Sequence, residues 1–404
     1  MTKEKVIPQI RFSGFTDTWE QHKLGDHSEI VAGGTPNTGH PEYWNPKEIP
    51  WMSSGEINNK VIYSTDNMIS KIGFSNSSAK WVKEKSVLIA LAGQGKTRGT
   101  VAISEIPLTT NQSIAAIQPD SFLYYKFLFQ NLEERYNELR EVSSGDGTRG
   151  GLNKQIISDL EVLAPEIQEQ IKIGDFLCGI DTLITLHQRK YDKLTKVKKA
   201  MLEKMFPENG SPYPEIRFKG FTDAWEQRKL GEISESFEYG LNAAATEYDG
   251  KHKYIRITDI DDSTHLFLQD DLTSPDIDFS TADDYLLQEG DVLFARTGAS
   301  VGKTYIYRRS DGDLYFAGFL IRAKIKSDYD ADFVFQNTLT DSYDSYIRIT
   351  SQRSGQPGVN AQEYANFALS VPSLAEQKKI GAYFSHLDSL ITLHQRKQKN
   401  RSQE

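Results

Sequence analysis

Residues 10–25 of this chain read IRFSGFTDTWEQHKLG, and residues 216–231 read IRFKGFTDAWEQRKLG. The two stretches differ only where Ser13, Thr18 and His22 are replaced by Lys219, Ala224 and Arg228. A second pair, LITLHQRK at 183–190 and 390–397, is identical and recurs at nearly the same distance. A period of about 206 residues is far longer than the ~20–50 residues of a solenoid or propeller repeat. The chain is therefore two copies of one domain-sized unit.

Composition limits the classes of protein that the chain can belong to. Of its 404 residues 38% are apolar, and no apolar run approaches the ~20 residues of a membrane span. The N-terminus lacks the apolar segment of a secretion signal, so we expect a cytoplasmic protein. A single cysteine, Cys178, excludes an internal disulfide and a Cys-rich metal site. The net charge of −9 means that any contact with nucleic acid must be local.

Each copy changes its pattern once along its length. Residues 10–165 and 216–372 mix short β-branched and aromatic runs with Gly, Pro, Asn and Asp, which indicates strands and loops, and a helix is expected at 124–140. From residue 166 to 206 the pattern is helical, with seam residues spaced alternately by four and three. These are Ile173, Leu177, Ile180, Ile184, His187, Tyr191, Leu194, Lys198, Met201 and Met205.

The same seam returns in the second copy, as Ile380, Phe384, Leu387, Ile391 and His394. A helix of about 40 residues is about 60 Å long, so it needs a partner, and the other copy supplies one. His187 and His394 take the same seam position, where a polar residue that sets the register is more common than a metal ligand. We expect no metal site.

The patterns together predict an α+β fold class. Two mixed α/β domains related by a pseudo-twofold axis are separated by two long helices that form a coiled coil. The expected boundaries are 1–165 for the first domain, 166–207 for the central helix, 208–372 for the second domain and 373–404 for the C-terminal helix.

One motif points to a different function. Residues 90–97 read ALAGQGKT, a relaxed P-loop ending in Gly95-Lys96-Thr97, and they follow an expected strand. A nucleotide-binding enzyme is therefore the alternative hypothesis. A P-loop must open a helix whose N–H groups hold phosphate, yet RGTV follows at 98–101, which favours a returning strand.

The Gly-rich basic loops at 93–99 and 296–303 also fit nucleic-acid recognition. Arg98 and Arg296 match the bidentate donor that guanine accepts, Gln94 matches adenine, and Lys96 and Lys303 suit phosphate. Ordinary turn chemistry and solvated charge remain the alternative explanation of each residue. With the polar loops at 33–40 and 239–242, the candidate DNA contacts are Thr35, Asn37, Gln94, Lys96, Thr97, Arg98, Tyr239, Asn242, Arg256, Arg296, Thr297, Ser300 and Lys303.

Catalytic motifs are missing from the sequence. It contains no HExxH, no GxSxG, no GxGxxG after a strand and no Asn-Pro-Pro-aromatic signature of an adenine methyltransferase. We therefore expect a chain without catalytic residues.

The order and duplication of these phrases resemble type I restriction-modification specificity subunits. The phrases that carry the resemblance are GGTP at 33–36, RFKGFTDAWE at 217–226, YIRITDI at 254–260, LFARTGASVGK at 293–303 and the helical regions 165–190 and 372–397. The resemblance covers nearly the whole chain.

It implies two target recognition domains, each reading one half of a split, asymmetric double-stranded DNA sequence, with the two long helices antiparallel and holding the domains at a set separation. It also implies two modification subunits, which supply S-adenosylmethionine and adenine methylation. Two restriction subunits would supply ATP-driven translocation and cleavage. On this reading the chain itself binds no cofactor and is not an enzyme.

Overall fold

The computed structural model describes all of the chain except residues 1–4, 93–96, 143–150, 209, 353–354 and 402–404. It divides into two compact units, Met1–Leu183 (unit 1) and Ile184–Glu404 (unit 2), which are described separately. The division falls within the longest helix, α5 (Ile167–Met205), so each unit includes part of that helix.

Unit 1 is built on a five-stranded sheet with the order β3-β10-β7-β8-β5. β10 is antiparallel to β3 and β7, β7 is antiparallel to β8, and β5 joins parallel to β8. The strands are β3 (Ser28–Ala32), β5 (Val61–Ile62), β7 (Ser86–Ala90), β8 (Val101–Ser104) and β10 (Ile114–Pro119). Every residue of β7 and β8 is buried, as expected of central strands packed on both faces.

Smaller elements surround this sheet. Two three-stranded sheets combine β1 (Lys5–Val6), β2 (Trp19–Lys23) and β11 (Glu161–Ala164), and β4 (Ile49–Met52), β6 (Asn67–Ile69) and β9 (Thr109–Thr110). The helices are α1 (Lys71–Ser75), α2 (Tyr125–Glu134), α3 (Tyr136–Val142) and α4 (Lys154–Asp159).

The prediction of a single helix at 124–140 is wrong in one respect, because the structure has two helices there, α2 and α3. The predicted helix breaks at Arg135, whose guanidinium donates to the Glu138 carboxylate and to the Glu161 carbonyl.

Unit 2 repeats the plan with a four-stranded sheet of order β13-β20-β17-β18. Its strands are β13 (Ser234–Tyr239), β17 (Val292–Ala295), β18 (Thr304–Ile306) and β20 (Leu320–Ile325). Two-stranded pairs join β12 (Glu226–Lys229) to β21 (Ala368–Val371), β14 (Ala245–Glu247) to β16 (Thr273–Pro275), and β15 (Lys253–Ile255) to β19 (Leu314–Phe316). The short helices are α6 (Leu230–Ile233), α7 (Ala331–Asn337), α8 (Asp341–Thr350) and α9 (Ala361–Ala365).

The duplicated sequence forms the same ion pair with the long helix in both copies. Arg11 donates two hydrogen bonds to the Glu169 carboxylate, at 2.6 and 2.7 Å, and Arg217 donates two to Glu376, both at 2.7 Å. The two carboxylates are buried at the starts of α5 and α10 (Leu374–Arg401). A bidentate ion pair of this kind fixes the segment before β2, and likewise the segment before β12, to the start of the long helix that follows each domain.

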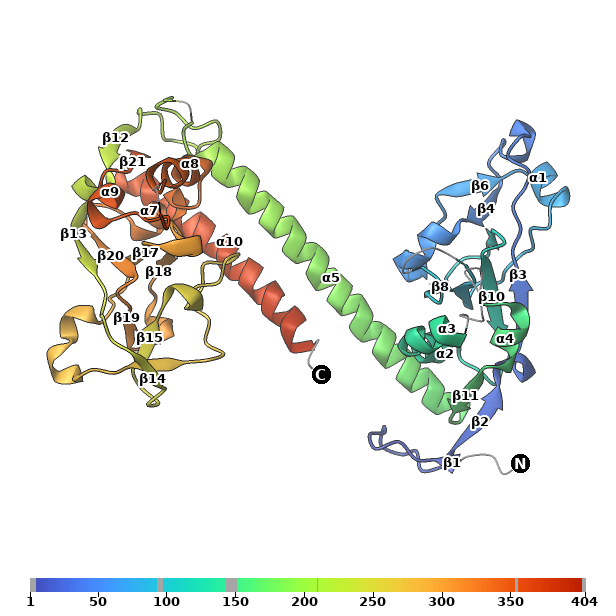
Figure 1. Ribbon diagram of the computed structural model, residues 1–404. Coiled ribbons are helices and arrows are strands. Elements are labelled where there is room, and N and C mark those ends of the chain that lie inside the picture. Colours follow the sequence, from blue (N-terminus) through green and yellow to red (C-terminus); the bar gives the residue numbers. More distant parts are fainter. Residues whose placement is uncertain (1–4, 93–96, 143–150, 209, 353–354, 402–404) are drawn as a thin grey trace. The chain divides into compact units, whose positions relative to one another are not determined.

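The long helices pack together within unit 2, where α5 is green and α10 red in Figure 1. The Nδ1 atoms of His187 and His394 are 2.8 Å apart, and Lys198 Nζ is 2.6 Å from Asp388 Oδ1. Residue numbers rise along α5 as they fall along α10, so the pair is antiparallel, as expected. The α10 seam residues Ile380, Phe384, Leu387 and Ile391 are all buried.

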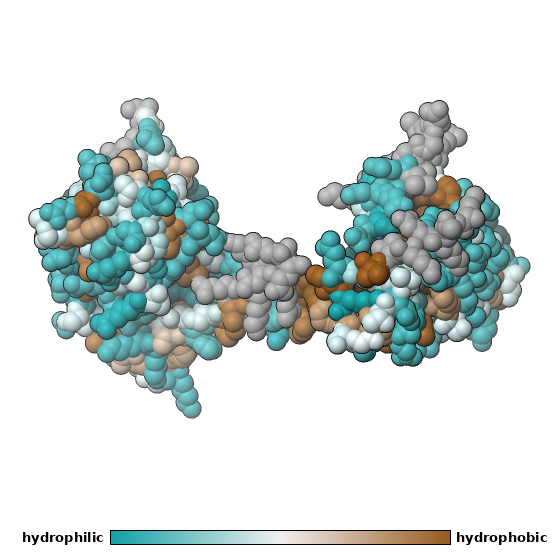
Figure 2. All heavy atoms as spheres, turned by 90° about the horizontal axis from the view of Figure 1, so that it is seen from below, coloured by the Kyte–Doolittle hydropathy of each residue, from teal (hydrophilic) through white to brown (hydrophobic). Residues whose placement is uncertain are grey.

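The surface shown in Figure 2 is mainly hydrophilic, with apolar residues in small groups between polar ones. Among the helices that the structure describes, none is long and apolar enough to cross a membrane. The described residues also contain no group of three or more His, Cys, Asp or Glu side chains placed to hold a metal ion.

Candidate nucleic-acid interface

Predicted contact residues gather at one edge of the sheet of unit 2. Because β20 is antiparallel to both β13 and β17, the ends of β13 and β17 lie beside the start of β20. β18 also begins at this edge, since Phe294 pairs with Thr304. We call this edge the strand-end surface of unit 2, formed by Tyr239, Asn242, Arg296, Thr297 and Phe319.

Arg296 is held in place by an aromatic ring. Its guanidinium carbon lies 4.9 Å from the ring centroid of Tyr239, and its Nη1 is 3.5 Å from the Gly318 carbonyl oxygen. The Tyr239 hydroxyl in turn accepts a hydrogen bond from the Ala361 N–H. Stacking of a planar guanidinium on a ring restrains it and leaves N–H donors in its plane for a ligand such as guanine.

Two buried tyrosines fix the loop between Arg296 and Lys303. The Tyr364 hydroxyl donates to the Ala295 carbonyl at 2.7 Å and accepts from the Gly302 N–H at 3.2 Å, while Tyr343 donates to the Gly302 carbonyl at 2.9 Å. Burial raises the pKa of both phenols, so both stay protonated. The loop that carries Thr297 and Ser300 is therefore presented from a rigid base.

Two of the predicted cations are already paired inside unit 2. Lys303 is nearly buried, donates to the Ile260 carbonyl at 3.0 Å and forms an ion pair with Asp262. Arg256, after β15, makes a bidentate contact with Asp259 at 2.8 and 2.9 Å. These contacts make both residues better suited to shaping their loops than to holding phosphate or a base.

Sequence reasoning missed two parts of this edge. Phe319 is 59% exposed in the turn before β20, and its carbonyl accepts the Arg296 N–H at 3.0 Å. Segment 357–359 runs alongside, because Gly298 N–H donates to the Pro357 carbonyl and Val359 N–H donates to the Arg296 carbonyl. No sequence signal identifies Phe319, because it lies in an apolar run that reads as continuous strand.

The matching edge of unit 1 carries Thr35, Asn37, Thr97 and Arg98. The Gly33 N–H donates to the carbonyl of Ile114, the first residue of β10, and the Gly240 N–H donates to the carbonyl of Leu320, the first residue of β20. The loops after β3 and β13 are therefore equivalent. Thr35 follows β3 with its hydroxyl bonded to the Gln112 side chain, and the Asn37 side chain accepts from Gly39 N–H at 2.9 Å.

Thr97 and Arg98 lie before β8, while Gln94 and Lys96 fall outside the described residues. Arg98 and Arg296 do not take equivalent places in the two units. The hydrogen-bond partners of Arg296 are matched by those of Leu91, whose N–H donates to the Ser113 carbonyl and whose own carbonyl accepts from Leu152. The two arginines thus stand at different points of their edges.

The described residues after the relaxed P-loop form a turn and then β8, not a helix. In unit 2 the equivalent loop ends at Gly302, which donates to Ala295 as Gly99 donates to Ala90, and it also leads directly into a strand, β18. Since a P-loop needs the N–H groups of a helix N-terminus, this topology opposes the nucleotide-binding alternative.

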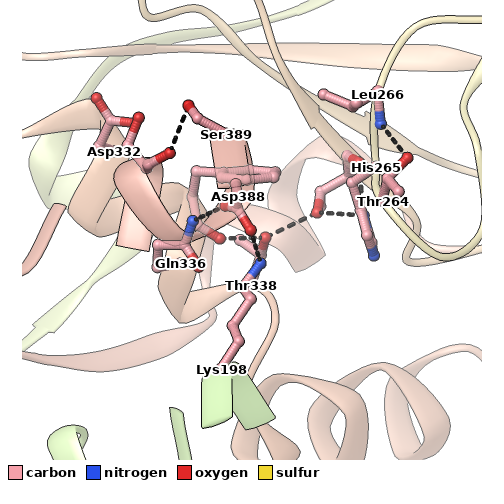
Figure 3. A network of polar contacts seen from close by, with 12 residues as sticks. Lys198, Thr264, His265, Leu266, Asp332, Gln336, Thr338, Asp388 and Ser389 are labelled. Atoms are coloured by element: carbon pink, nitrogen blue, oxygen red, sulfur yellow. Dashed lines mark hydrogen bonds and ion pairs between the residues drawn. The ribbon is translucent and has the colours of Figure 1, made fainter. Parts of the chain in front are cut away.

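A groove of about 560 Å³ lies next to the loop of Ser300 and Lys303, between α5 and α8. Figure 3 shows the polar contacts beside it, which extend from the helix pair to the start of β18. Asp388 binds Lys198 and accepts from Gln336 at 2.8 Å. The Thr338 and Thr304 hydroxyls are 2.7 Å apart, and His265 Nδ1 is 2.8 Å from the Thr304 carbonyl oxygen.

We expect His265 to make unit 2 sensitive to acid. Burial lowers its pKa, and the charges of Lys198 and Lys303 lower it further. Below about pH 6.5 the unfolded chain therefore binds a proton that the folded chain excludes, so stability falls as the pH drops towards the folded pKa. Melting temperatures of unit 2 should fall by several degrees between pH 7 and pH 5.

The matched variant for this test is His265→Asn. The backbone of His265 has a φ of 57°, which asparagine tolerates, and the amide N–H can replace the imidazole donor. The variant should lose part of the pH dependence and keep its stability at pH 8. An unchanged slope between pH 7 and pH 5 would assign the acid sensitivity to other groups.

Comparison with known proteins identifies the architecture. The family model described as "Type I restriction modification DNA specificity domain" matches residues 16–196 and again residues 222–401. The MjaIX type I restriction enzyme specificity subunit of Methanocaldococcus jannaschii is 29% identical over 308 residues, covering 70% of this chain and 67% of that protein.

The MjaVIII specificity subunit of the same organism is 21% identical and covers 98% of this chain and 92% of its own length. Among solved structures, the type I restriction-modification S subunit of M. genitalium aligns over 98% of this chain and 96% of that one. The alignment has a TM-score of 0.60 at 14% identity, which is a likeness of fold.

Proposed function

Because this chain belongs to the type I restriction-modification DNA specificity family and is a non-catalytic subunit with two target recognition domains, we propose that each domain reads half of a split double-stranded DNA sequence. The observation that carries the proposal is that both units bring the same strand ends to one edge while bearing different side chains there. A common frame with different contacts is what reading two unrelated half-sites requires.

We assign the contacts in two groups. In the second domain Arg296, stacked on Tyr239, is the main base reader, with Asn242, Thr297 and Ser300 near it. In the first domain Thr35, Asn37, Thr97 and Arg98 take the corresponding edge, and Gln94 and Lys96 remain sequence predictions there. Lys303 and Arg256 shape their loops through Asp262 and Asp259.

Element ends support the expected domain boundaries. β11 ends at Ala164 and α5 begins at Ile167, while β21 ends at Val371 and α10 begins at Leu374. We therefore assign the target recognition domains to 1–165 and 208–372 and the helical regions to 166–207 and 373–404. The complex that we propose adds two modification and two restriction subunits, which bring the catalytic sites and cofactors.

Arg296→Ala tests the assignment of the strand-end surface. Loss of a bidentate contact to guanine should cost about 1–3 kcal/mol in binding and relax specificity in the second half-site only. The target is first found by methylome sequencing of cells that carry the chain and its modification subunits. Binding of the complex is then measured on duplexes substituted in each half-site.

Arg228→Ala is the matched control, because Arg228 is an exposed arginine on β12 paired with Glu226, outside the strand-end surface. It removes the same charge and should leave both half-sites equally well read. Equal loss of discrimination in the two half-sites after Arg296→Ala would show that Arg296 is not a base reader.

A further inference from the structure

Phe319 is unusual because its aromatic side chain is exposed to solvent in a turn. It is a large apolar side chain, 59% exposed, within the strand-end surface of unit 2. The Arg296 N–H donates to its carbonyl at 3.0 Å, and Arg296 itself stacks on Tyr239, whose side chain is 43% exposed. An exposed phenylalanine is thus joined through its backbone to an arginine that lies over the ring of an exposed tyrosine.

The turn that bears Phe319 is tightly held. Gly318 N–H donates to the Leu241 carbonyl at 2.7 Å, and Leu320 N–H donates to the Ala317 carbonyl at 2.8 Å. A Cβ atom at Gly318 would stand only 3.1 Å from the Leu241 oxygen, so the two loops are in close contact there. The direction of the Phe319 side chain relative to Arg296 is therefore set by backbone hydrogen bonds.

The first domain has nothing comparable at the matching position. There the Leu91 N–H donates to the carbonyl of Ser113, as the Arg296 N–H does to that of Phe319. Ser113 is small and polar, whereas Phe319 presents a ring. Ser113 and Phe319 therefore differ at the strand-end edge, where the two domains are proposed to read different half-site sequences.

We propose that Phe319 contacts the 5-methyl group of a thymine in the half-site read by the second domain, beside the base pair taken by Arg296. This inference rests on the proposed function and names one of its specificity contacts. Of the four base pairs only those with thymine offer an apolar group in the major groove, and an aromatic side chain is a suitable partner for it. Ser113 offers no such surface, so the first half-site is read without this contact.

The test removes the methyl group alone. Each thymine of the second half-site is replaced in turn by deoxyuridine, and binding by the complex with modification subunits is measured. One position should weaken binding by the native chain by about fourfold, the effect of withdrawing one buried CH₂-sized group. With Phe319→Ser the same replacement should have no effect, and deoxyuridine in the first half-site should affect both proteins alike.

Each other outcome is decisive. If Phe319→Ser weakens binding to thymine and deoxyuridine duplexes equally, the ring stacks as a wedge between base pairs or supports the loop, and the methyl contact is refuted. A second half-site without thymine, or one in which no deoxyuridine matters to the native chain, refutes it as well. Melting curves show whether the exposed substitution leaves folding intact.

Binding of the Arg296→Ala variant to the same duplexes distinguishes a failure of the Phe319 contact from a failure of the assigned reading surface. If that variant loses discrimination in the second half-site while deoxyuridine has no effect, only the role of Phe319 is wrong. If Arg296→Ala changes nothing either, the strand-end surface is not the reading surface, and the assignment on which this inference rests fails with it.

Discussion

Replacing Phe206 by alanine should lower the free energy of unfolding of unit 2 by about 3–5 kcal/mol, the usual cost of emptying a buried aromatic site. Phe206 directly follows the last residue of α5 and is 5% exposed. Its ring stacks on Phe333 with centroids 5.5 Å apart and also meets Trp225 at 6.2 Å and Phe384 at 5.9 Å. The substitution thus opens a cavity where α5, α7 and α10 meet.

Scanning calorimetry of the full chain is the measurement, because the two units can then be followed as separate transitions. Phe176→Ala provides the control, since Phe176 is also an aromatic residue of α5 but is 55% exposed, with an edge contact to Phe12. It should cost about 1 kcal/mol or less. A loss for Phe206→Ala as small as the loss for Phe176→Ala would mean that the Phe206 ring contributes little to the stability of unit 2.

Arg322→Met should have an effect of similar size, about 3–5 kcal/mol, because it removes one partner from a buried charge cluster. The Arg322 side chain, on β20, is 2% exposed and pairs with Glu238 on β13. It also lies 3.6 Å from the buried Asp291 carboxylate and donates to the Asp284 carbonyl at 2.7 Å. Methionine fills much of the volume but removes the guanidinium beside Asp291, and of these two cations the carboxylate then keeps only Lys324.

Denaturant unfolding at neutral pH measures this loss, and a second substitution identifies its cause. If the penalty comes from the uncompensated carboxylate, Arg322→Met with Asp291→Asn should recover a substantial part of it. A double variant no more stable than the single one would show that packing of the guanidinium against Phe316, 5.0 Å away, is the larger contribution.

Much of the fold could be predicted because the same sequence pattern occurs in both copies of the repeat. Seam residues spaced by four and three placed the central helix at 166–206, and the structure has it at Ile167–Met205. The length of the helix and its repeated seam predicted a partner in the other copy, and the family resemblance implied an antiparallel pair; the contacts His187–His394 and Lys198–Asp388 confirm both. Periodicity does not show where a helix breaks, so the interruption at Arg135, stabilised by distant Glu161, was missed.

The site was harder to predict because its properties depend on contacts between loops. The pairing of Lys303 with Asp262 joins residues far apart in the sequence, so a cation that looked available for phosphate is occupied. Arg98 and Arg296 occur in similar Gly-rich phrases, but Arg296 precedes the first glycine of its loop, Gly298, and Arg98 precedes the last glycine of its loop, Gly99, so the two residues take different positions.

The aromatic pair on which Phe206 packs has a counterpart in the first domain. Trp225 and Phe333, which receive its ring, lie 5.7 Å apart edge to face, and Trp19 and Phe127 of the first domain lie 5.8 Å apart with the same geometry. A recombination crossover within the duplicated sequences at 10–25 and 216–231 would carry a complete receiving pair into its new place. We therefore expect that an exchange of the two domains by recombination would keep an aromatic pair on which the end of the helix can pack.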